Sequence, residues 1–223
     1  MSEETPSWIQ GTGVETSMEG DPRSGGANIR YWMPPGSEKT VIFLSEGNDA
    51  PVIWEHQYKQ GNSYKNWSTC LQPLGMTCPL CAAADASKTS GRYKGMFFSI
   101  IDCTEFTDKG GNKRVNEKRI LVAKASTADI IKRKYISRVD AGGGLRGAKF
   151  KIYRPKKDTS AAVGEDYEFI EMVDLAKFED TTPFDLMEIA KPDPEKMERA
   201  AALLMGDGGS DEKPAGSDSK VSY

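Results

Sequence analysis

The chain has 223 residues, of which 38% are hydrophobic and 28% are charged, and its formal net charge at pH 7 is −3. This length suits one domain with a substantial core or a smaller domain with extended tails, and the high charge favours the second organisation. No apolar run approaches the roughly 20 residues of a membrane-spanning helix, and the acidic start MSEETPSWIQGTG is unlike a secretory signal. We therefore expect a soluble, intracellular protein that does not bind a membrane.

Basic and acidic residues are segregated along the chain. Residues 28–163 hold 23 basic and 12 acidic residues, whereas residues 1–27 hold one basic and five acidic residues. Residues 164–223 hold six basic and 16 acidic residues. A basic body is expected of a protein that binds a polyanion, because each Lys or Arg placed at a phosphate releases condensed counterions. A solvated surface with acidic ends added for solubility would give the same pattern.

Composition divides the chain into four segments. Residues 1–27 are predicted to be a flexible acidic segment, and residues 28–180 are predicted to form the folded domain, with a cysteine-containing subdomain at about residues 56–95. Residues 181–205 are predicted to be a short helical segment, because Pro192 and Pro194 precede a run of good helix formers. The stretch 206–223 offers almost nothing to bury and is predicted to be a disordered acidic tail.

The folded domain is predicted to be mainly β, because short runs rich in β-branched and aromatic residues alternate with Gly, Pro, Asn and Asp turns. In chain order, the predicted strands are residues 29–33, 40–44, 51–58, 95–103, 118–124, 147–154 and 165–172. This spacing indicates a small, mainly antiparallel barrel or sandwich, and an OB-fold-like barrel is the interpretation that we favour.

One helix is predicted between the fifth and sixth strands, in STADIIKRKYISRV, with Ser126 or Thr127 as its N-cap. Its apolar stripe is formed by Ile130, Ile131, Tyr135 and Val139. A helix inserted between barrel strands is common in OB-type folds, so this helix agrees with the favoured interpretation.

Three of the four cysteines lie in TCLQPLGMTCPLCAA, residues 69–83. Cys78 and Cys81 have the CxxC spacing that lets two thiolates from one tight turn, with turn amides directed at the sulfurs, reach the same tetrahedral ion. Cys70 and the only histidine, His56, precede them in the chain. Three thiolates and one imidazole form a closed set for a structural Zn²⁺ that staples this loop and folds with it.

Cys103 is the alternative to His56 as the fourth ligand. Strand alternation in MFFSIIDC places Cys103 on the same face as Phe97 and Ile101, which suits a buried thiol in the core. We therefore expect His56 to be the ligand.

Several enzymatic interpretations of the cysteines do not fit. A thioredoxin-like redox pair needs a βαβ context and a helix after its first cysteine, and the local sequence predicts neither. A zinc deaminase needs Glu two residues after its histidine, but Gln57 and Tyr58 follow His56. The chain contains no P-loop and no GxSxG motif. We therefore expect a protein that is not an enzyme.

Aromatic residues are interleaved with the cations of the basic body, as in proteins that bind single strands through a positive groove and stacked rings. The residues predicted to contact nucleic acid are Arg30, Tyr58, Lys59, Tyr64, Lys65, Trp67, Arg92, Tyr93, Lys94, Lys132, Arg133, Lys134, Lys149, Lys151 and Tyr153. Strand aromatics flanked by aliphatic residues are instead expected in the core, and these are Trp32, Trp54, Phe97 and Phe98.

The runs NIRYWMPPGSEKTVIFLSEG, PVIWEHQY, NWSTC and CPLC, within residues 28–105, resemble the zinc-containing single-stranded-DNA-binding, or helix-destabilising, proteins of tailed phages. The resemblance implies an OB-fold core and a structural zinc held by His56, Cys70, Cys78 and Cys81. It also implies a protein that coats single strands in replication, recombination and repair, in the cytoplasm of an infected bacterial host.

The same resemblance implies that an acidic C-terminal tail recruits replication or recombination proteins, and that the protein associates with itself on DNA. The best-known members of the family use a basic N-terminal segment for that association, whereas residues 1–27 are acidic here. A zinc-bearing protein-interaction or structural module of a phage or replication complex is the alternative function.

Overall fold

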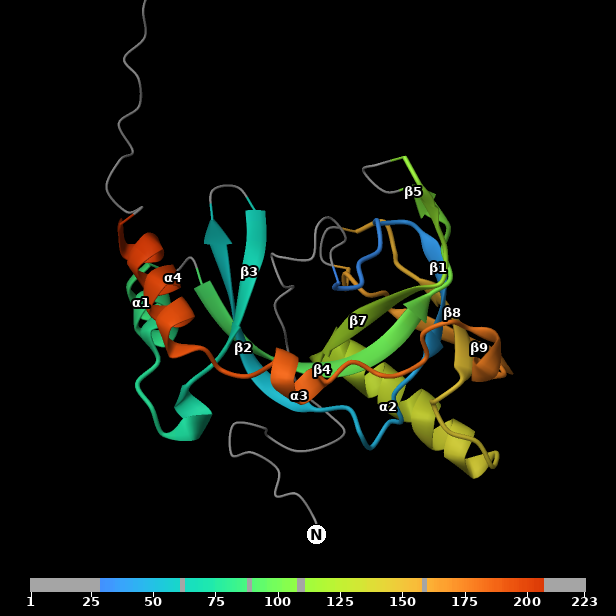
Figure 1. Cartoon of the computed structure of the whole chain (residues 1–223). Helices are drawn as coiled ribbons and strands as arrows, with labels where there is room; N and C mark the ends of the chain where they lie inside the picture. Colours follow the sequence, from blue (N-terminus) through green and yellow to red (C-terminus); the bar gives the residue numbers. More distant parts are fainter. Residues whose placement is uncertain (1–28, 61–62, 88–89, 108–110, 158–159, 207–223) are drawn as a thin grey trace, which may run out of the picture.

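The computed structural model describes residues 29–60, 63–87, 90–107, 111–157 and 160–206 (Figure 1). Within these ranges the fold is mainly β, an antiparallel sheet accompanied by few helices, as the sequence predicts. The prediction of a flexible segment at 1–27 falls outside the described residues, and so does the predicted disordered tail at 206–223 except for Gly206, which ends a helix. No helix in the described part of the chain is long and apolar enough to span a membrane.

One seven-stranded sheet forms the body, in the order β3-β2-β4-β1-β8-β9, with β7 paired to β4 beside this path. Its strands are β1 (Glu38–Phe43), β2 (Val52–Gln60), β3 (Ser63–Thr69), β4 (Ser90–Asp102), β7 (Glu117–Lys124), β8 (Ala148–Tyr153) and β9 (Asp166–Met172). The long strand β4 joins two halves, because its first part pairs with β2 whereas its last residues pair with both β1 and β7. The described strands do not close into a barrel, since β3 and β9 end the path.

The strand predictions need two corrections. Residues 29–33 do not form a strand. The only β-bridge described for them is an isolated parallel bridge between Arg30 and Ile120. Strand β3 and the small hairpin of β5 (Phe106–Thr107) and β6 (Lys113–Arg114) were not predicted. Their sequences lack an apolar alternation, so only their partner strands make them recognisable as strands.

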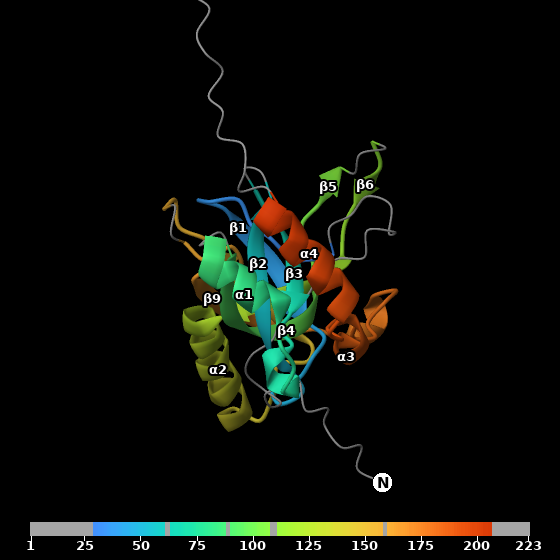
Figure 2. The same ribbon diagram turned by 90° about the vertical axis from the view of Figure 1, so that its left-hand side faces the viewer.

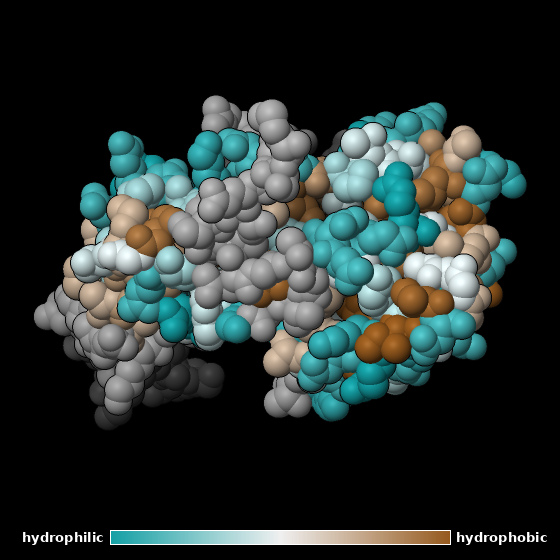
Figure 3. Space-filling view, turned by 90° about the horizontal axis from the view of Figure 1, so that it is seen from below, coloured by the Kyte–Doolittle hydropathy of each residue, from teal (hydrophilic) through white to brown (hydrophobic). Residues whose placement is uncertain are grey.

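The helices are α1 (Pro79–Ser87), α2 (Ala125–Asp140), α3 (Leu186–Ile189) and α4 (Pro194–Gly206), with short 3₁₀ turns at Gln72–Leu74 and Leu175–Lys177. Helix α2 confirms the predicted helix, but the predicted cap is wrong, because α2 follows β7 directly and Lys124 is its N-cap. Of its predicted apolar stripe, Ile131 is buried and Val139 is 47% exposed. The face of the molecule to which α2 belongs is mostly hydrophilic, with apolar residues in between (Figure 3).

The main core lies between the curved sheet and α2. Phe43 of β1 contacts Phe98 of β4 and Phe150 of β8 edge to face, with ring centroids 5.2 and 5.5 Å apart. Phe97, on the opposite face of β4, belongs to a second core covered by α3. Phe97 and Phe98 are therefore buried as predicted, whereas Trp32 is 53% exposed and that prediction is wrong.

Gly164 provides a test of the packing between the β8–β9 connection and the main core. Its φ is +90°, and an added Cβ would lie 2.2 Å from Cγ2 of Ile152. Gly142 has a similar φ of +78° but no atom within 4 Å of an added Cβ. We expect Gly142→Ala to lower the free energy of unfolding by about 1 kcal/mol, because only backbone strain is added. We expect Gly164→Ala to lower it by about 3 kcal/mol, because the new Cβ also collides with the side chain of Ile152.

Urea unfolding followed by circular dichroism would measure both losses. Equal losses in the two alanine variants would contradict the tight contact of Gly164 with the core.

Candidate metal centre

Four side chains meet where β2, β3 and α1 come together: His56, Cys70, Cys78 and Cys81, whose ligand atoms all lie within 4.8 Å of one another. Nε2 of His56 is 3.3 Å from Sγ of Cys78 and 3.3 Å from Sγ of Cys81. Sγ of Cys70 is 3.7 Å from Sγ of Cys81. A tetrahedral zinc site with ordinary bond lengths would have S–S and S–N separations of about 3.8 and about 3.6 Å. The cluster is therefore compatible with one tetrahedrally bound metal ion.

The strands and the loop after them place these four residues. His56 lies opposite Ser68 in the β2–β3 ladder, and the amide of Cys70 donates to the carbonyl of Trp54 at 2.8 Å, which extends the ladder to the first cysteine. The chain then turns back through a 3₁₀ turn that ends at Gly75, whose φ is +72°. We call residues 70–87, from Cys70 to the end of α1, the metal loop.

Backbone amides point at the sulfurs, as the CxxC spacing predicts. The backbone at Leu71 and Cys81 lowers the pKa of Cys78, and the backbone at Gln72 opposes the rise in the pKa of Cys70. One expectation was wrong: α1 begins at Pro79, directly after Cys78, whereas the local sequence predicted no helix there. The surrounding strands are antiparallel, so the βαβ context of a thioredoxin-like pair is absent from the described sheet.

Hydrogen bonds within the cluster separate the pKa values of its thiols. The hydrogen bond from Cys70 and, to a lesser extent, that from His56 lower the pKa of Cys78 to about 3, against the effect of burial. The pKa of Cys70 is raised, mainly because its thiol donates to Cys78, and burial raises the pKa of Cys81. One thiolate is thus already favoured in the protein without metal, and a bound cation would favour the other two.

Arg92 of β4 connects the cluster to an aromatic side chain. Its Nη1 lies 3.7 Å from Sγ of Cys70, and its Cζ lies 4.3 Å from the ring centroid of Trp54. Nζ of Lys94 lies 5.2 Å from the same ring. We call Trp54, Arg92 and Lys94 the cationic platform. Trp54 is half-buried against the metal loop, so the core prediction for this residue is confirmed in part.

Cys103 lies outside the cluster. It is half-buried beside Ile42, Leu44 and Ile101, in a separate apolar cluster at the end of β4. Of the two ligands that the sequence left open, the structure therefore brings His56, and not Cys103, to the other cysteines.

A buried polar network next to the metal centre was not foreseen from the sequence. The carboxylate of Glu55 is fully buried, 2.5 Å from Nη2 of Arg30, and accepts a hydrogen bond from the hydroxyl of Tyr93. Nζ of Lys124 lies 3.5 Å from the ring centroid of Tyr93. Burial raises the pKa of Glu55, and the ion pair with Arg30 opposes this effect. Arg30 and Tyr93 were predicted to contact nucleic acid, but the structure places Arg30 in the interior and turns the hydroxyl of Tyr93 inward.

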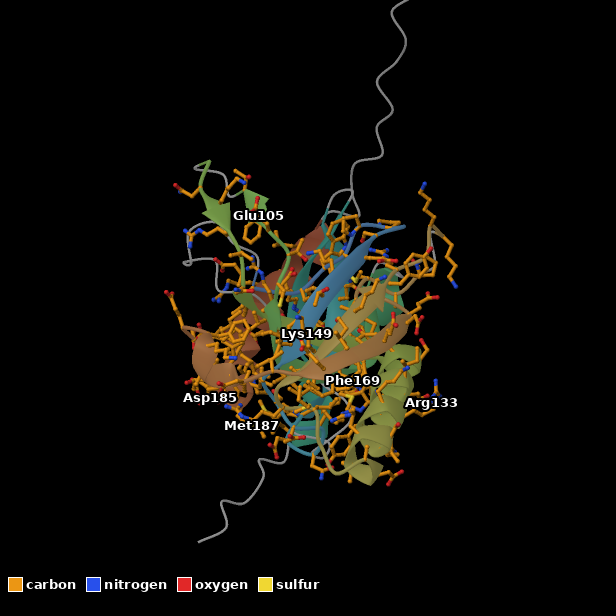
Figure 4. The ribbon with its side chains drawn as sticks, turned by 90° about the vertical axis from the view of Figure 1, so that its right-hand side faces the viewer. Glu105, Arg133, Lys149, Phe169, Asp185 and Met187 are labelled. Carbon is orange, nitrogen blue, oxygen red and sulfur yellow. The ribbon has the colours of Figure 1, made fainter. Side chains whose placement is uncertain are left out.

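The cations predicted on α2 and β8 have different surroundings. Lys132 and Arg133 are exposed on α2 and Lys134 is half-buried, and Arg133 projects from the helix away from the sheet (Figure 4). On β8, Nζ of Lys149 lies 2.8 Å from Glu171, and Nζ of Lys151 lies 2.6 Å from Glu38.

Side chains alternate between the two faces of β8. Phe150, Ile152 and Arg154 are buried, while Tyr153 on the other face is 42% exposed. Because both lysines of that face are paired with carboxylates, its charge is mixed rather than basic.

The remaining predicted contacts lie in the β2–β3 hairpin, and these side chains are outside the described residues: Tyr58, Lys59, Tyr64, Lys65 and Trp67. The backbones of Tyr58, Lys59, Tyr64 and Trp67 pair within the hairpin. The prediction that these five side chains contact nucleic acid stays a prediction.

No protein-family model, curated protein sequence or solved structure matches this chain.

Proposed function

We propose that this chain is a sequence-nonspecific single-stranded-DNA-binding protein whose metal is a structural zinc ion. The observation that carries the proposal is the cationic platform, because it puts an indole and two cations next to a metal centre that fixes their strands. Trp54 lies two residues before His56 in β2, and Arg92 lies opposite His56 in β4. The metal would hold these strands and the loop in one geometry.

The chemistry of the platform suits a single strand. Arg92 is exposed and Lys94 is half-buried, so both lie where a phosphate can reach them. Base stacking on an aromatic side chain contributes roughly 1–3 kcal/mol per base and tolerates any sequence. Pairing of backbone phosphates with Arg and Lys adds a favourable contribution to the binding free energy, and this contribution weakens as the salt concentration rises. Together these give binding without base readout.

The donor set favours zinc with a structural role. Three thiolates and one imidazole are soft ligands that fill a tetrahedral zinc shell and leave no open position for a substrate. The nearest buried carboxylate, Glu55, is held by Arg30 and is not presented as a base at the cluster. The zinc would supply folding free energy to the metal loop, and no chemical step is assigned to it.

The wider proposal follows the phage family that the sequence resembles. In it, β1, β4, β7, β8 and β9, which pack around the main core with α2, would correspond to a partly open OB-fold-like barrel. The protein would coat single strands during phage DNA replication, recombination and repair in the host cytoplasm. Its acidic C-terminal segment would recruit replication proteins, and copies would associate on DNA.

One observation favours the alternative, a zinc-bearing protein-interaction module. The face that contains Lys149 and Lys151 carries Glu38 and Glu171 as their partners, so it suits a protein surface of mixed charge better than a phosphate backbone.

Paired charge removals test the platform. We expect Arg92→Gln combined with Lys94→Gln to weaken binding of a fluorescent oligo-dT at least about tenfold. The slope of the logarithm of the binding constant against the logarithm of the salt concentration should become shallower by about 1.4, which corresponds to the loss of two single-strand phosphate contacts. The control is Lys156→Gln combined with Lys157→Gln, which removes the same amount of charge from two exposed residues. These residues follow β8, and β1 lies between β8 and β4 in the sheet. Equal effects of the two double variants would contradict the platform as the contact site.

A further inference from the structure

Helix α4 lies on the metal loop although it is far from it in the sequence. In Figure 2 it runs beside α1 at the same end of the molecule, and α1 is the principal element against which it packs. Met197 is 0% exposed, Ala200 is 3% exposed and Ala201 is 2% exposed. With half-buried Leu204 they follow the spacing of one helical face. Leu203 and Met205, which lie on the two flanks of this face, are 57% and 64% exposed.

The buried face of α4 contacts the metal ligands themselves. Sδ of Met197 lies 3.7 Å from Sγ of Cys78. Met197, Ala200 and Ala201 share one apolar cluster with Cys70, Leu71, Cys78, Leu80 and Ala83 of the metal loop. The metal centre is therefore covered by a helix that comes from the C-terminal end of the described chain.

Neither partner of this contact is long enough to be a stable helix by itself. Helix α1 has nine residues and α4 has 13, whereas isolated helices shorter than about 12–15 residues are marginal in water. A metal ion bound by Cys78 and Cys81 would fix the first turn of α1 and the apolar surface that α4 covers. In turn, α4 removes that surface from water.

From this arrangement we infer that the metal loop is a docking surface for an amphipathic helix, that α4 is its occupant, and that metal binding and α4 docking stabilise each other. The sequence after α4, residues 207–223, contains four acidic and two basic residues. The metal centre would thus anchor residues 207–223, which follow α4, to the body of the protein. This inference rests on metal binding, one part of the proposed function, and is independent of DNA binding.

The coupling has a measurable size and must be reciprocal. Coupled sites in proteins commonly change each other's affinity by roughly 5- to 150-fold. If zinc favours the docked helix, disruption of docking has to weaken zinc binding by the same factor.

The test uses the full chain with zinc as the probe. Hydrogen exchange is measured in the zinc-loaded protein and after chelation, with metal content determined in both samples. We expect chelation to speed exchange of the α4 amides at least about fivefold, while the amides of β1 and β8 report that the main core stays folded. Zinc affinity is then measured by chelator competition in Met197→Asp and in Leu203→Asp, a matched control at an exposed position of α4. A loss of at least about fivefold is expected in Met197→Asp alone.

The outcomes separate this inference from the proposed function. A chain that binds one zinc but keeps α4 equally protected without it would overturn the coupling and leave the metal centre intact. Equal zinc affinities in the two variants would also overturn it. A chain that binds no zinc would overturn the metal centre and the coupling together. Failure to bind single strands would leave this inference standing.

Discussion

Cys78→Ser is expected to reduce bound zinc from one ion per chain to nearly none and to unfold the metal loop. Cys78 is the ligand most committed to the thiolate form, because hydrogen bonds lower its pKa to about 3, and its sulfur lies within 3.3 Å of Nε2 of His56. Structural zinc contributes about 10–16 kcal/mol of apparent binding free energy in zinc-finger peptides at pH 7, so its loss should exceed any single contact in the loop. Metal analysis and limited proteolysis within residues 70–87 measure the two effects.

Cys103→Ser is the matched control, since it changes the one cysteine outside the cluster. It should retain one zinc per chain and resist proteolysis as the unmodified protein does. Loss of zinc in Cys103→Ser, or retention of zinc in Cys78→Ser, would show that the ligand set is not the one described.

Glu55→Gln is expected to destabilise the fold by about 3–5 kcal/mol, because it removes one charge of the buried ion pair between Arg30 and Glu55. The side chains of Arg30 and Glu55 are only 9% and 0% exposed, so water cannot replace the lost partner. Guanidinium chloride unfolding, followed by circular dichroism on zinc-loaded protein, measures the change in the free energy of unfolding.

Two further variants show whether the loss comes from burial of the charge. Glu105→Gln breaks an ion pair with Lys113 whose side chains are 62% and 75% exposed, and it should cost less than about 1 kcal/mol. Replacement of Arg30 and Glu55 together by Met should recover much of the stability lost in Glu55→Gln, because both charges of the buried ion pair are then replaced by apolar side chains. A double variant less stable than Glu55→Gln would contradict this explanation.

The cluster of His56, Cys70, Cys78 and Cys81, which could hold a metal ion, was predictable from the sequence because the chemistry of these residues leaves few alternatives. A CxxC pair, a third cysteine eight residues earlier and a single histidine make a complete tetrahedral set. The β-rich body was also predictable, because runs such as TVIFL and KRILVAK alternate or cluster apolar residues between turn residues. Both predictions depend on local patterns that the remainder of the chain does not override.

Contacts between distant strands were not predictable. Whether Arg30 points to solvent or into the core depends on its bridge to Ile120 and on Glu55, which is 25 residues away. Lys149 and Lys151 appear as free cations in the sequence, and only the registers of β8 with β1 and β9 bring carboxylates to them.

The cover of the metal loop by α4 was missed for a similar reason. The spacing of Met197, Ala200, Ala201 and Leu204 indicates an amphipathic helix but does not identify the surface that it covers. Cys78 and Met197 are 119 residues apart in the chain, so only the tertiary structure brings them together.

Titration of the zinc-loaded protein with fluorescent oligo-dT, and with a duplex of equal length, at several salt concentrations tests the central claim most directly. The proposed function predicts submicromolar binding of the single strand at low salt, at least about 100-fold weaker binding of the duplex, and a steep loss of affinity with salt. Quenching of tryptophan emission should accompany binding, since Trp54 lies in the cationic platform. Micromolar or weaker binding without preference for the single strand would contradict the proposed function.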